Sequence, residues 1–292
     1  MKNPIRFIQN ELNGIYSKSE ISVLIRLILA NVCNASFADI TNHKISHLSD
    51  ENGKKVTEIV CRLRKNEPIQ YILGTTEFYG LPFRVTPDVL IPRPETEELV
   101  EWILSEHTNG AQLSILDIGT GSGCIAIALA KKIPDAHVFA WDISEKALAV
   151  AAENAKRNAV NVQLKKQDVF APVASKNQYD IIVSNPPYVL EAEKMEMAEN
   201  VLGFEPHIAL FVPNKNPLLF YEHIADIAKK LLKPGGKLYF EINREKGDAV
   251  STMMREKGFV DVEVRKDMSG NERMVRAKSK KITEKIYLPP PY

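Results

Sequence analysis

The chain has 292 residues, 45% of them hydrophobic and 26% charged, which is typical of a globular protein with one large domain or one medium and one small. The formal net charge of +1 excludes a global basic field of the kind that attracts nucleic acid or membranes. The three cysteines are far apart and match neither a disulfide nor a metal-ligand spacing, so we expect free thiols in a reducing cytoplasm and no metal: Cys33, Cys61 and Cys124. The N-terminus also lacks the layout of a signal peptide, which predicts a cytoplasmic protein.

Residues 1–70 are predicted to form a small helical bundle. Apolar residues recur at helical spacing in SEISVLIRLILANVC, where Ser19 is the expected N-cap. This segment is too short to span a membrane and carries Arg26. A second helical segment, DENGKKVTEIVCRLRKNEP, ends at Pro68.

A linker and a tail flank the main part of the chain. Residues 71–94 alternate apolar residues with glycines and prolines, which predicts a linker with a short β-hairpin whose turn lies at or near Gly80. Residues 278–292 are basic and then proline-rich, and we expect a loosely held tail.

Residues 95–277 alternate between apolar strands and amphipathic helices, after a first helix in ETEELVEWIL. This alternation predicts a doubly wound α/β fold with a mostly parallel, seven-stranded sheet covered on both faces. No helix separates the last two strands, so one of them is expected to be antiparallel. The expected strands are residues 113–119, 137–142, 162–168, 179–185, 237–242, 260–267 and 272–277. The expected helices between them centre on residues 123–133, 144–158, 218–232 and 244–258.

A glycine-rich turn, in LSILDIGTGSGCIAIALA, connects the first of these strands to a helix. Such a turn lies at the carboxyl edge of the sheet, where open α/β folds bind ligands. The glycines follow a G-x-G-x-G spacing, whereas the third glycine of the dinucleotide fingerprint would fall on Cys124. Asp117 precedes the glycines, and its carboxylate would repel a pyrophosphate but could face the cationic S-adenosyl-L-methionine. The D-x-G-x-G-x-G pattern resembles the cofactor loop of class I adenosylmethionine-dependent methyltransferases; a tight turn in an unrelated α/β fold and a nicotinamide enzyme are the alternatives. The candidate cofactor residues of this loop are Asp117, Gly119, Thr120, Gly121, Ser122 and Gly123.

Two further acids end the second and third strands. Asp142 can accept hydrogen bonds from both ribose hydroxyls, although it could also form a capping box with Glu145. Asp168 lies where the methyltransferase resemblance implies an acid near the adenine amine, with an ordinary loop acid as the alternative. Phe170 or Val169 is expected to pack on the adenine ring.

The fourth strand ends in Asn-Pro-Pro-Tyr, which can be a simple turn or a pocket for a planar –NH2 group. The side-chain oxygen of Asn185 and the carbonyl oxygen of Pro186 can accept from the two N–H bonds of such a group. Pro187 stiffens the loop, and Tyr188 offers a flat face for stacking. Methyl transfer would then be an in-line displacement with the nitrogen within about 3–3.5 Å of the methyl carbon, without a general base. Asn185 is also expected to contact the cofactor.

Two segments resemble the HemK/PrmC family of release factor glutamine methyltransferases. They are residues 67–100, which contain IPRPETE, and FEPHIAL at residues 204–210. The resemblance implies methyl transfer from adenosylmethionine, with S-adenosylhomocysteine as product, to the glutamine amide in the Gly-Gly-Gln loop of peptide chain release factors. It also implies that the N-terminal helices grip the release factor. Arg93 and Glu95 could line the substrate pocket, or could satisfy loop carbonyls and the helix dipole instead.

Two other functions remain open at this stage. A nucleic-acid methyltransferase acting on adenine or guanine amines could use the same Asn-Pro-Pro-Tyr pocket, but it predicts a basic face or a recognition module, neither of which the sequence contains. A non-catalytic binding module would be favoured by loss of the motif residues, and these are present. We therefore expect release factors as partners, with no membrane and no direct nucleic-acid substrate.

Overall fold

The computed structural model describes residues 1–34, 36–41, 45–107, 112–174 and 178–280. The chain divides into two compact units. The first comprises Met1–Thr75, Val85–Pro87 and Glu196–Glu205, and the second comprises Thr76–Arg84, Asp88–Met195 and the chain from Pro206 onward. Of the predicted tail, residues 281–292 lie outside the described residues, and Lys278 ends a strand of the sheet.

The first unit is helical. Its helices are α1 (Pro4–Leu12), α2 (Lys18–Cys33), α3 (Phe37–Thr41), α4 (Asp50–Leu63), α5 (Ile69–Leu73) and α9 (Glu199–Phe204). The apolar positions at helical spacing form one buried core, as the periodicity predicts, and its fully buried members include Ile8, Leu12, Ile28, Leu29 and Val56. Asn66, after α4, donates a 2.8 Å hydrogen bond to Glu199 of α9 and so joins segments distant in sequence.

The predicted N-cap of α2 is wrong by two residues. Ser17 caps the helix, because its hydroxyl accepts from the Glu20 amide at 3.2 Å while the Glu20 carboxylate accepts from the Ser17 amide at 2.8 Å. This reciprocal capping box requires a serine three residues before a glutamate, and Ser19 has none at that spacing.

The predicted hairpin is formed by β1 (Thr75–Phe78) and β2 (Leu81–Arg84). Tyr79 and Gly80 form its two-residue turn with φ angles of 52° and 71°, the positive values that such turns require. The hairpin belongs to the second unit from Thr76 onward, and Asn154 of α8 holds it there: the Asn154 side chain accepts from the Arg84 amide at 2.6 Å and donates to the Arg84 carbonyl at 3.0 Å.

The second unit is built on a seven-stranded sheet in the order β10-β11-β9-β6-β3-β4-β5. In this sheet β11 runs opposite to the other six strands, which confirms the expected mostly parallel sheet with one reversed strand. The strands are β3 (Ser114–Ile118), β4 (His137–Asp142), β5 (Val162–Lys166), β6 (Tyr179–Ser184), β9 (Leu232–Glu241), β10 (Val260–Lys266) and β11 (Glu272–Lys278). The strand order reverses between β3 and β6, so the loops after these two strands meet at the carboxyl edge.

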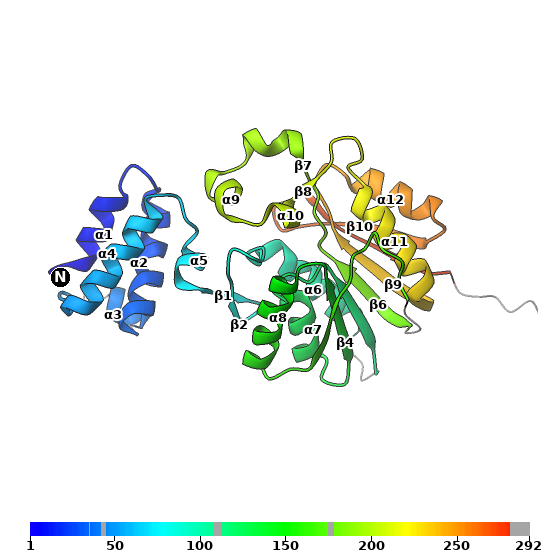
Figure 1. Ribbon diagram of the computed structural model, residues 1–292, viewed down its shortest axis with the longest axis horizontal. Helices are drawn as coiled ribbons and strands as arrows, with labels where there is room; N and C mark the ends of the chain where they lie inside the picture. The colour runs from blue at the N-terminus through cyan, green and yellow to red at the C-terminus, as the bar shows by residue number, and fades with distance from the viewer. Residues whose placement is uncertain (35, 42–44, 108–111, 175–177, 281–292) are drawn as a thin grey trace, which may run out of the picture. The chain divides into compact units, whose positions relative to one another are not determined.

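Helices cover both faces of this sheet (Figure 1). One face carries α6 (Pro94–Ser105), α7 (Cys124–Lys132) and α8 (Glu145–Arg157), and the other carries α11 (Leu219–Leu231) and α12 (Gly247–Glu256). Neighbouring strand residues alternate between the two cores: Ile115 and Ile181 pack under α6 and α7, whereas Leu116 and Ile182 pack under α11 and α12. Both faces are therefore buried, which explains the near-continuous apolar strands.

The segment between β6 and α11 contains short elements that the sequence patterns did not predict. They are β7 (Val189–Leu190), the 3-10 helix η1 (Glu191–Glu196), α10 (His207–Leu210) and β8 (Phe211–Val212), in addition to α9. β7 and β8 pair in parallel as a separate two-stranded sheet. Among the described residues, no helix is both long enough and apolar enough to cross a membrane.

Candidate active site

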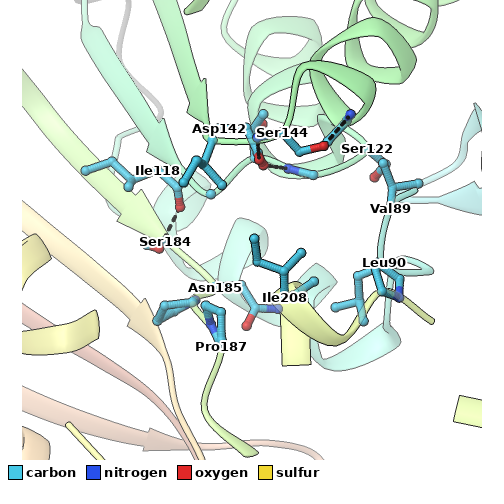
Figure 2. A pocket seen from close by; sticks show the side chains of 18 of the residues that line it. Val89, Leu90, Ile118, Ser122, Asp142, Ser144, Ser184, Asn185, Pro187 and Ile208 are labelled. Carbon is cyan, nitrogen blue, oxygen red and sulfur yellow. Dashed lines mark hydrogen bonds between the residues drawn. The ribbon is translucent and has the colours of Figure 1, made fainter. Parts of the chain in front are cut away.

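A cavity opens at the carboxyl edge of the sheet, at the point where the strand order reverses (Figure 2). It lies wholly within the second unit, and its wall comes from the ends of four parallel strands and from three other segments. The contributing segments are the chain before α6 with the first turn of that helix, the loops after β3, β4, β5 and β6, the start of α10, and α11.

The three glycines of the loop after β3 have different structural roles. All have positive φ, at 74° for Gly119, 55° for Gly121 and 83° for Gly123. A Cβ atom added to Gly119 or Gly121 would meet nothing within 4 Å, so the backbone there borders open space. A Cβ atom on Gly123 would lie 2.9 Å from Ile127 and 3.2 Å from Ala151, so this glycine allows α7 to approach α8. Gly119 and Gly121 lie in the cavity wall and Gly123 does not.

The remainder of the glycine loop is fixed against β4. The amides of Gly119 and Thr120 both donate to the Trp141 carbonyl, at 2.8 and 3.0 Å. Thr120 and Ser122 are buried and line the cavity. The loop therefore has a fixed shape that comes from backbone contacts with the neighbouring strand.

Asp117 lies behind the cavity wall and is fully buried. Its Oδ2 atom accepts from the Thr120 hydroxyl at 2.6 Å, and within the described residues Oδ1 has no hydrogen-bond partner. Burial raises the pKa of this carboxyl to about 7, against the opposing effect of the Thr120 hydrogen bond. The structure thus places Asp117 beneath the glycine loop and not directly on the cavity surface.

Asp142 lies in the cavity wall at the end of β4 (Figure 2). Its Oδ2 atom accepts from the Gly121 amide at 2.8 Å, and its Oδ1 atom accepts from the Ser144 amide at 2.9 Å. Burial raises the pKa of this carboxyl above its ordinary value. The alternative interpretation of Asp142 as a helix cap is wrong: the chain enters α8 two residues later, where Ser144 caps the helix by accepting from the Ala147 amide at 3.2 Å.

The loop after β5 supplies another part of the wall, with Asp168, Val169 and Phe170. Asp168 accepts from the Phe170 amide at 2.8 Å through Oδ1. The Phe170 ring is 45% exposed, and its centroid lies 4.8 Å from that of His223 and 5.2 Å from that of Phe220. An apolar surface therefore adjoins the carboxylate at this end of the cavity.

Asn185, Pro186 and Pro187 line the cavity after β6, and Figure 2 shows Asn185 and Pro187 across the opening from Asp142. Tyr188 is not part of the wall. Its ring packs against the core under α11 and its hydroxyl donates to Oε1 of Glu241 at 3.2 Å, and burial raises its pKa. The structure therefore places the predicted stacking face of Tyr188 behind the cavity.

The two IPRPETE residues also differ in position. Arg93 lines the cavity, whereas Glu95 lies in the first turn of α6 outside the wall. For Glu95 this is the placement that favourable interaction with the helix dipole predicts.

Two residues of the site were missed by the sequence patterns, namely Thr96 and Glu241. Thr96 lies in the first turn of α6 and lines the cavity, and its hydroxyl donates to Oε2 of Glu241 at 2.6 Å. Nδ2 of Asn185 donates to the Thr96 oxygen at 3.3 Å. Burial raises the pKa of the Glu241 carboxyl. A signal for Glu241 was present, because it ends a strand beside the reversal point, like Asp142.

The wall residues suit a ligand with a polar sugar and an apolar base. The glycine loop leaves open space beside backbone amides, Asp142 offers remaining acceptor capacity, and Phe170 offers an aromatic surface. The unpartnered oxygen of Asp117 lies beneath the same loop and suits a cationic group. These features fit adenosylmethionine better than a dinucleotide, whose pyrophosphate would lie over the loop above the Asp117 carboxyl.

The doubly wound sheet and the cavity at its reversal point define a class I adenosylmethionine-dependent methyltransferase. A methyltransferase from Pyrococcus furiosus has a similar fold, with a TM-score of 0.52 and 20% identity over 77% of this chain and 99% of that one. Residues 5–74 match the family model of the PrmC N-terminal domain, and residues 96–203 match that of the methyltransferase small domain.

Relatives of the whole chain define the family more closely. The release factor glutamine methyltransferase of Bacteroides thetaiotaomicron is 50% identical over 272 residues, which cover 93% of this chain and 97% of the relative. That of Flavobacterium psychrophilum is 43% identical over 274 residues, which cover 93% and 96%. The chain belongs to the release factor glutamine methyltransferase family, which confirms the HemK/PrmC prediction.

Proposed function

We propose that this protein transfers a methyl group from adenosylmethionine to the side-chain amide nitrogen of the glutamine in the Gly-Gly-Gln loop of peptide chain release factors. One observation carries the proposal: the glycine loop and Asn185 border a single cavity, in a chain 50% identical to a release factor glutamine methyltransferase over almost its whole length. The nucleic-acid alternative has no comparable support among the close relatives.

In this proposal the cofactor is held by the side of the cavity that carries the glycine loop. The glycine loop, with Gly119, Thr120, Gly121 and Ser122, contacts the amino-acid part of the cofactor. Asp117 adds negative charge from beneath this loop. Asp142 accepts from the ribose hydroxyls, because both of its oxygens are already oriented by backbone amides. Asp168 and Phe170 contact the adenine.

The substrate amide is held by Asn185 and Pro186 on the opposite side. An amide nitrogen is a poor nucleophile because its lone pair is delocalised into the carbonyl group. The Asn185 side-chain oxygen and the Pro186 carbonyl oxygen would each accept a hydrogen bond from one of its two N–H groups. These bonds would fix the amide nitrogen in place and increase its electron density. Bound adenosylmethionine supplies an electrophilic methyl group on a sulfonium. The C–N bond would form as the S–C bond breaks, the electron pair would stay on the sulfur of S-adenosylhomocysteine, and the amide proton would leave to water.

The helical first unit is proposed to recognise the release factor, while the second unit carries out the methyl transfer. The match of residues 5–74 to the family model of the PrmC N-terminal domain supports a separate role for the first unit. The predicted segments 1–70, 71–94 and 95–277 would then correspond to recognition, linker and catalysis. The near-neutral net charge suits a protein partner better than naked nucleic acid.

The test is transfer of a labelled methyl group from adenosylmethionine to a purified release factor. Parallel reactions contain its loop Gln→Ala variant, bulk RNA or DNA. We expect label on the intact factor alone, and a loss of at least about 100-fold in the Asn185→Ala enzyme, with the exposed Asn161→Ala as matched control. Label on nucleic acid and none on the factor would overturn the proposal.

A further inference from the structure

A buried hydrogen-bond chain connects the end of β9 to the cavity. Glu241 is 1% exposed and Thr96 is 2% exposed, although the two residues are 145 positions apart in the sequence. The Glu241 carboxylate accepts from the Thr96 hydroxyl at 2.6 Å and from the Tyr188 hydroxyl at 3.2 Å. The chain continues to the cavity wall through the 3.3 Å hydrogen bond between Thr96 and Asn185.

The direction of each hydrogen bond in this series follows from which of the two groups can donate a proton. An ionised carboxylate only accepts, so the Thr96 hydroxyl must give its single proton to Glu241. The Thr96 oxygen can then only accept from Asn185, which must turn its –NH2 group toward Thr96. The carbonyl oxygen of Asn185 is thereby left for other partners.

This orientation matters because an asparagine amide is nearly symmetric in shape and opposite in polarity at its two ends. Turned by 180°, Asn185 would present donors where the substrate amide also presents donors, and the two would repel each other. Burial raises the pKa of Glu241, and the hydrogen bond from Thr96 and the positive charge of Arg273, whose guanidinium donates to the Ile242 carbonyl at 3.4 Å, oppose this by favouring the ionised form.

We propose that Glu241 is a positioning residue that acts through Thr96 to fix the amide of Asn185 with its oxygen toward the substrate –NH2 group. The inference rests on the proposed function for the identity of that substrate. Tyr188 has a supporting place in this arrangement, because its hydroxyl donates to the other oxygen of the same carboxylate.

The main test compares two substitutions of one residue. Thr96→Val keeps the shape and removes the hydroxyl, whereas Thr96→Ser keeps the hydroxyl and removes the methyl group. For methylation of a release factor at saturating adenosylmethionine, we expect Thr96→Val to lower kcat about 100-fold and Thr96→Ser to stay within about 3-fold of wild type. Thr252→Val, on the exposed face of α12, is the matched control and should not change kcat.

Glu241→Gln tests the carboxylate itself. A glutamine can accept from Thr96 or donate to it, so the amide of Asn185 is no longer held in one orientation, and we expect kcat to fall about 10-fold. Affinity for adenosylmethionine, measured by calorimetry, should change less than about 3-fold in all of these variants. Equal rates in Thr96→Val and Thr96→Ser, or a wild-type rate in Glu241→Gln, would overturn the inference.

A second measurement does not depend on activity. In protein labelled with 15N-asparagine, the Asn185 –NH2 protons, assigned by their loss in Asn185→Asp, should show a nuclear Overhauser effect to the Thr96 methyl group. The effect should weaken in Glu241→Gln, and its absence from the wild type would refute the orientation. If the wild type shows the effect but methylates no release factor, the proposed function fails and the positioning by Glu241 stands.

Discussion

Replacement of Asp117 by asparagine should stabilise the folded protein at alkaline pH, and the gain should disappear as the pH falls. The wild-type carboxyl is fully buried, one of its oxygens has no partner within the described residues, and its pKa is raised from 3.8 to about 7. That difference corresponds to about 4 kcal/mol of destabilisation in the ionised state.

The sign follows from proton binding in the two states. Above pH 7 the group is ionised in both the folded and the unfolded chain, and the full penalty is present. Between pH 7 and about 4 the folded state keeps the proton and the unfolded state does not, so the penalty decreases by about 1.4 kcal/mol per pH unit. Below pH 4 both states are protonated and the penalty vanishes.

The assay is urea unfolding of the wild type and Asp117→Asn at pH 8, 7, 6 and 5. Other titrating groups cancel in the difference between the two proteins, and an unpaired asparagine N–H adds only a pH-independent offset. We expect this difference in free energy of unfolding to shrink by about 3 kcal/mol from pH 8 to pH 5. A difference that does not vary with pH would refute a raised pKa at Asp117.

The remaining predictions concern the glycine loop and a charge cluster on the sheet. Gly121→Ala should weaken adenosylmethionine binding at least about 10-fold, measured by calorimetry, with a stability loss of about 1 kcal/mol, because its Cβ enters open space at a φ of 55°. Gly123→Ala should instead cost about 2–3 kcal/mol of stability in urea unfolding, since its Cβ would lie 2.9 Å from a side-chain atom; equal stability losses in the two variants would contradict the division of roles. Glu106 accepts from Lys237 and Arg276, both at 2.6 Å. Burial alone would raise the pKa of its carboxyl, but the hydrogen bonds from Lys237, Tyr239 and Trp102 lower it to about 2. Its stabilisation is therefore present above about pH 4.5 and lost toward pH 2, so Glu106→Gln should lower the urea midpoint at pH 7 but not at pH 2.

Most of the sheet could be predicted from the sequence because each strand carries its own local signal. The runs that end at Asp142 and Asn185 are apolar, lie between amphipathic helices and stop at polar or proline residues, and these features need no knowledge of distant contacts. The glycine loop was predictable for the same reason, since its spacing is short and its backbone angles exclude most other residues.

What could not be predicted depends on long-range pairing or on competition between equivalent local patterns. Thr96 and Glu241 meet only because the start of α6 lies beside the end of β9; the strand-end position of Glu241 was a local signal, but nothing in the sequence near Thr96 indicates that the two residues pair. The spacing of Asp142 and Glu145 also fits a capping box, but Ser144 takes that role once the turn after β4 is fixed by backbone hydrogen bonds to Asp142. The same competition explains why the sequence pattern predicts Ser19 as the N-cap of α2, whereas Ser17 caps this helix.

The fixed carboxylate of Asp142 has a consequence for selectivity among the many adenosine compounds of a cell. Two backbone amides hold this carboxylate in place, so it cannot rotate away from a second negative charge on a ligand. Where the proposed site accepts a free ribose diol, a phosphate ester at the 2′ or 3′ oxygen would bring a second negative charge next to it. Two like charges about 4 Å apart near a protein surface repel each other by about 4 kcal/mol, close to a thousandfold in affinity. If Asp142 binds the ribose as proposed, the same carboxylate would also select against phosphorylated adenosine compounds such as NADP and coenzyme A.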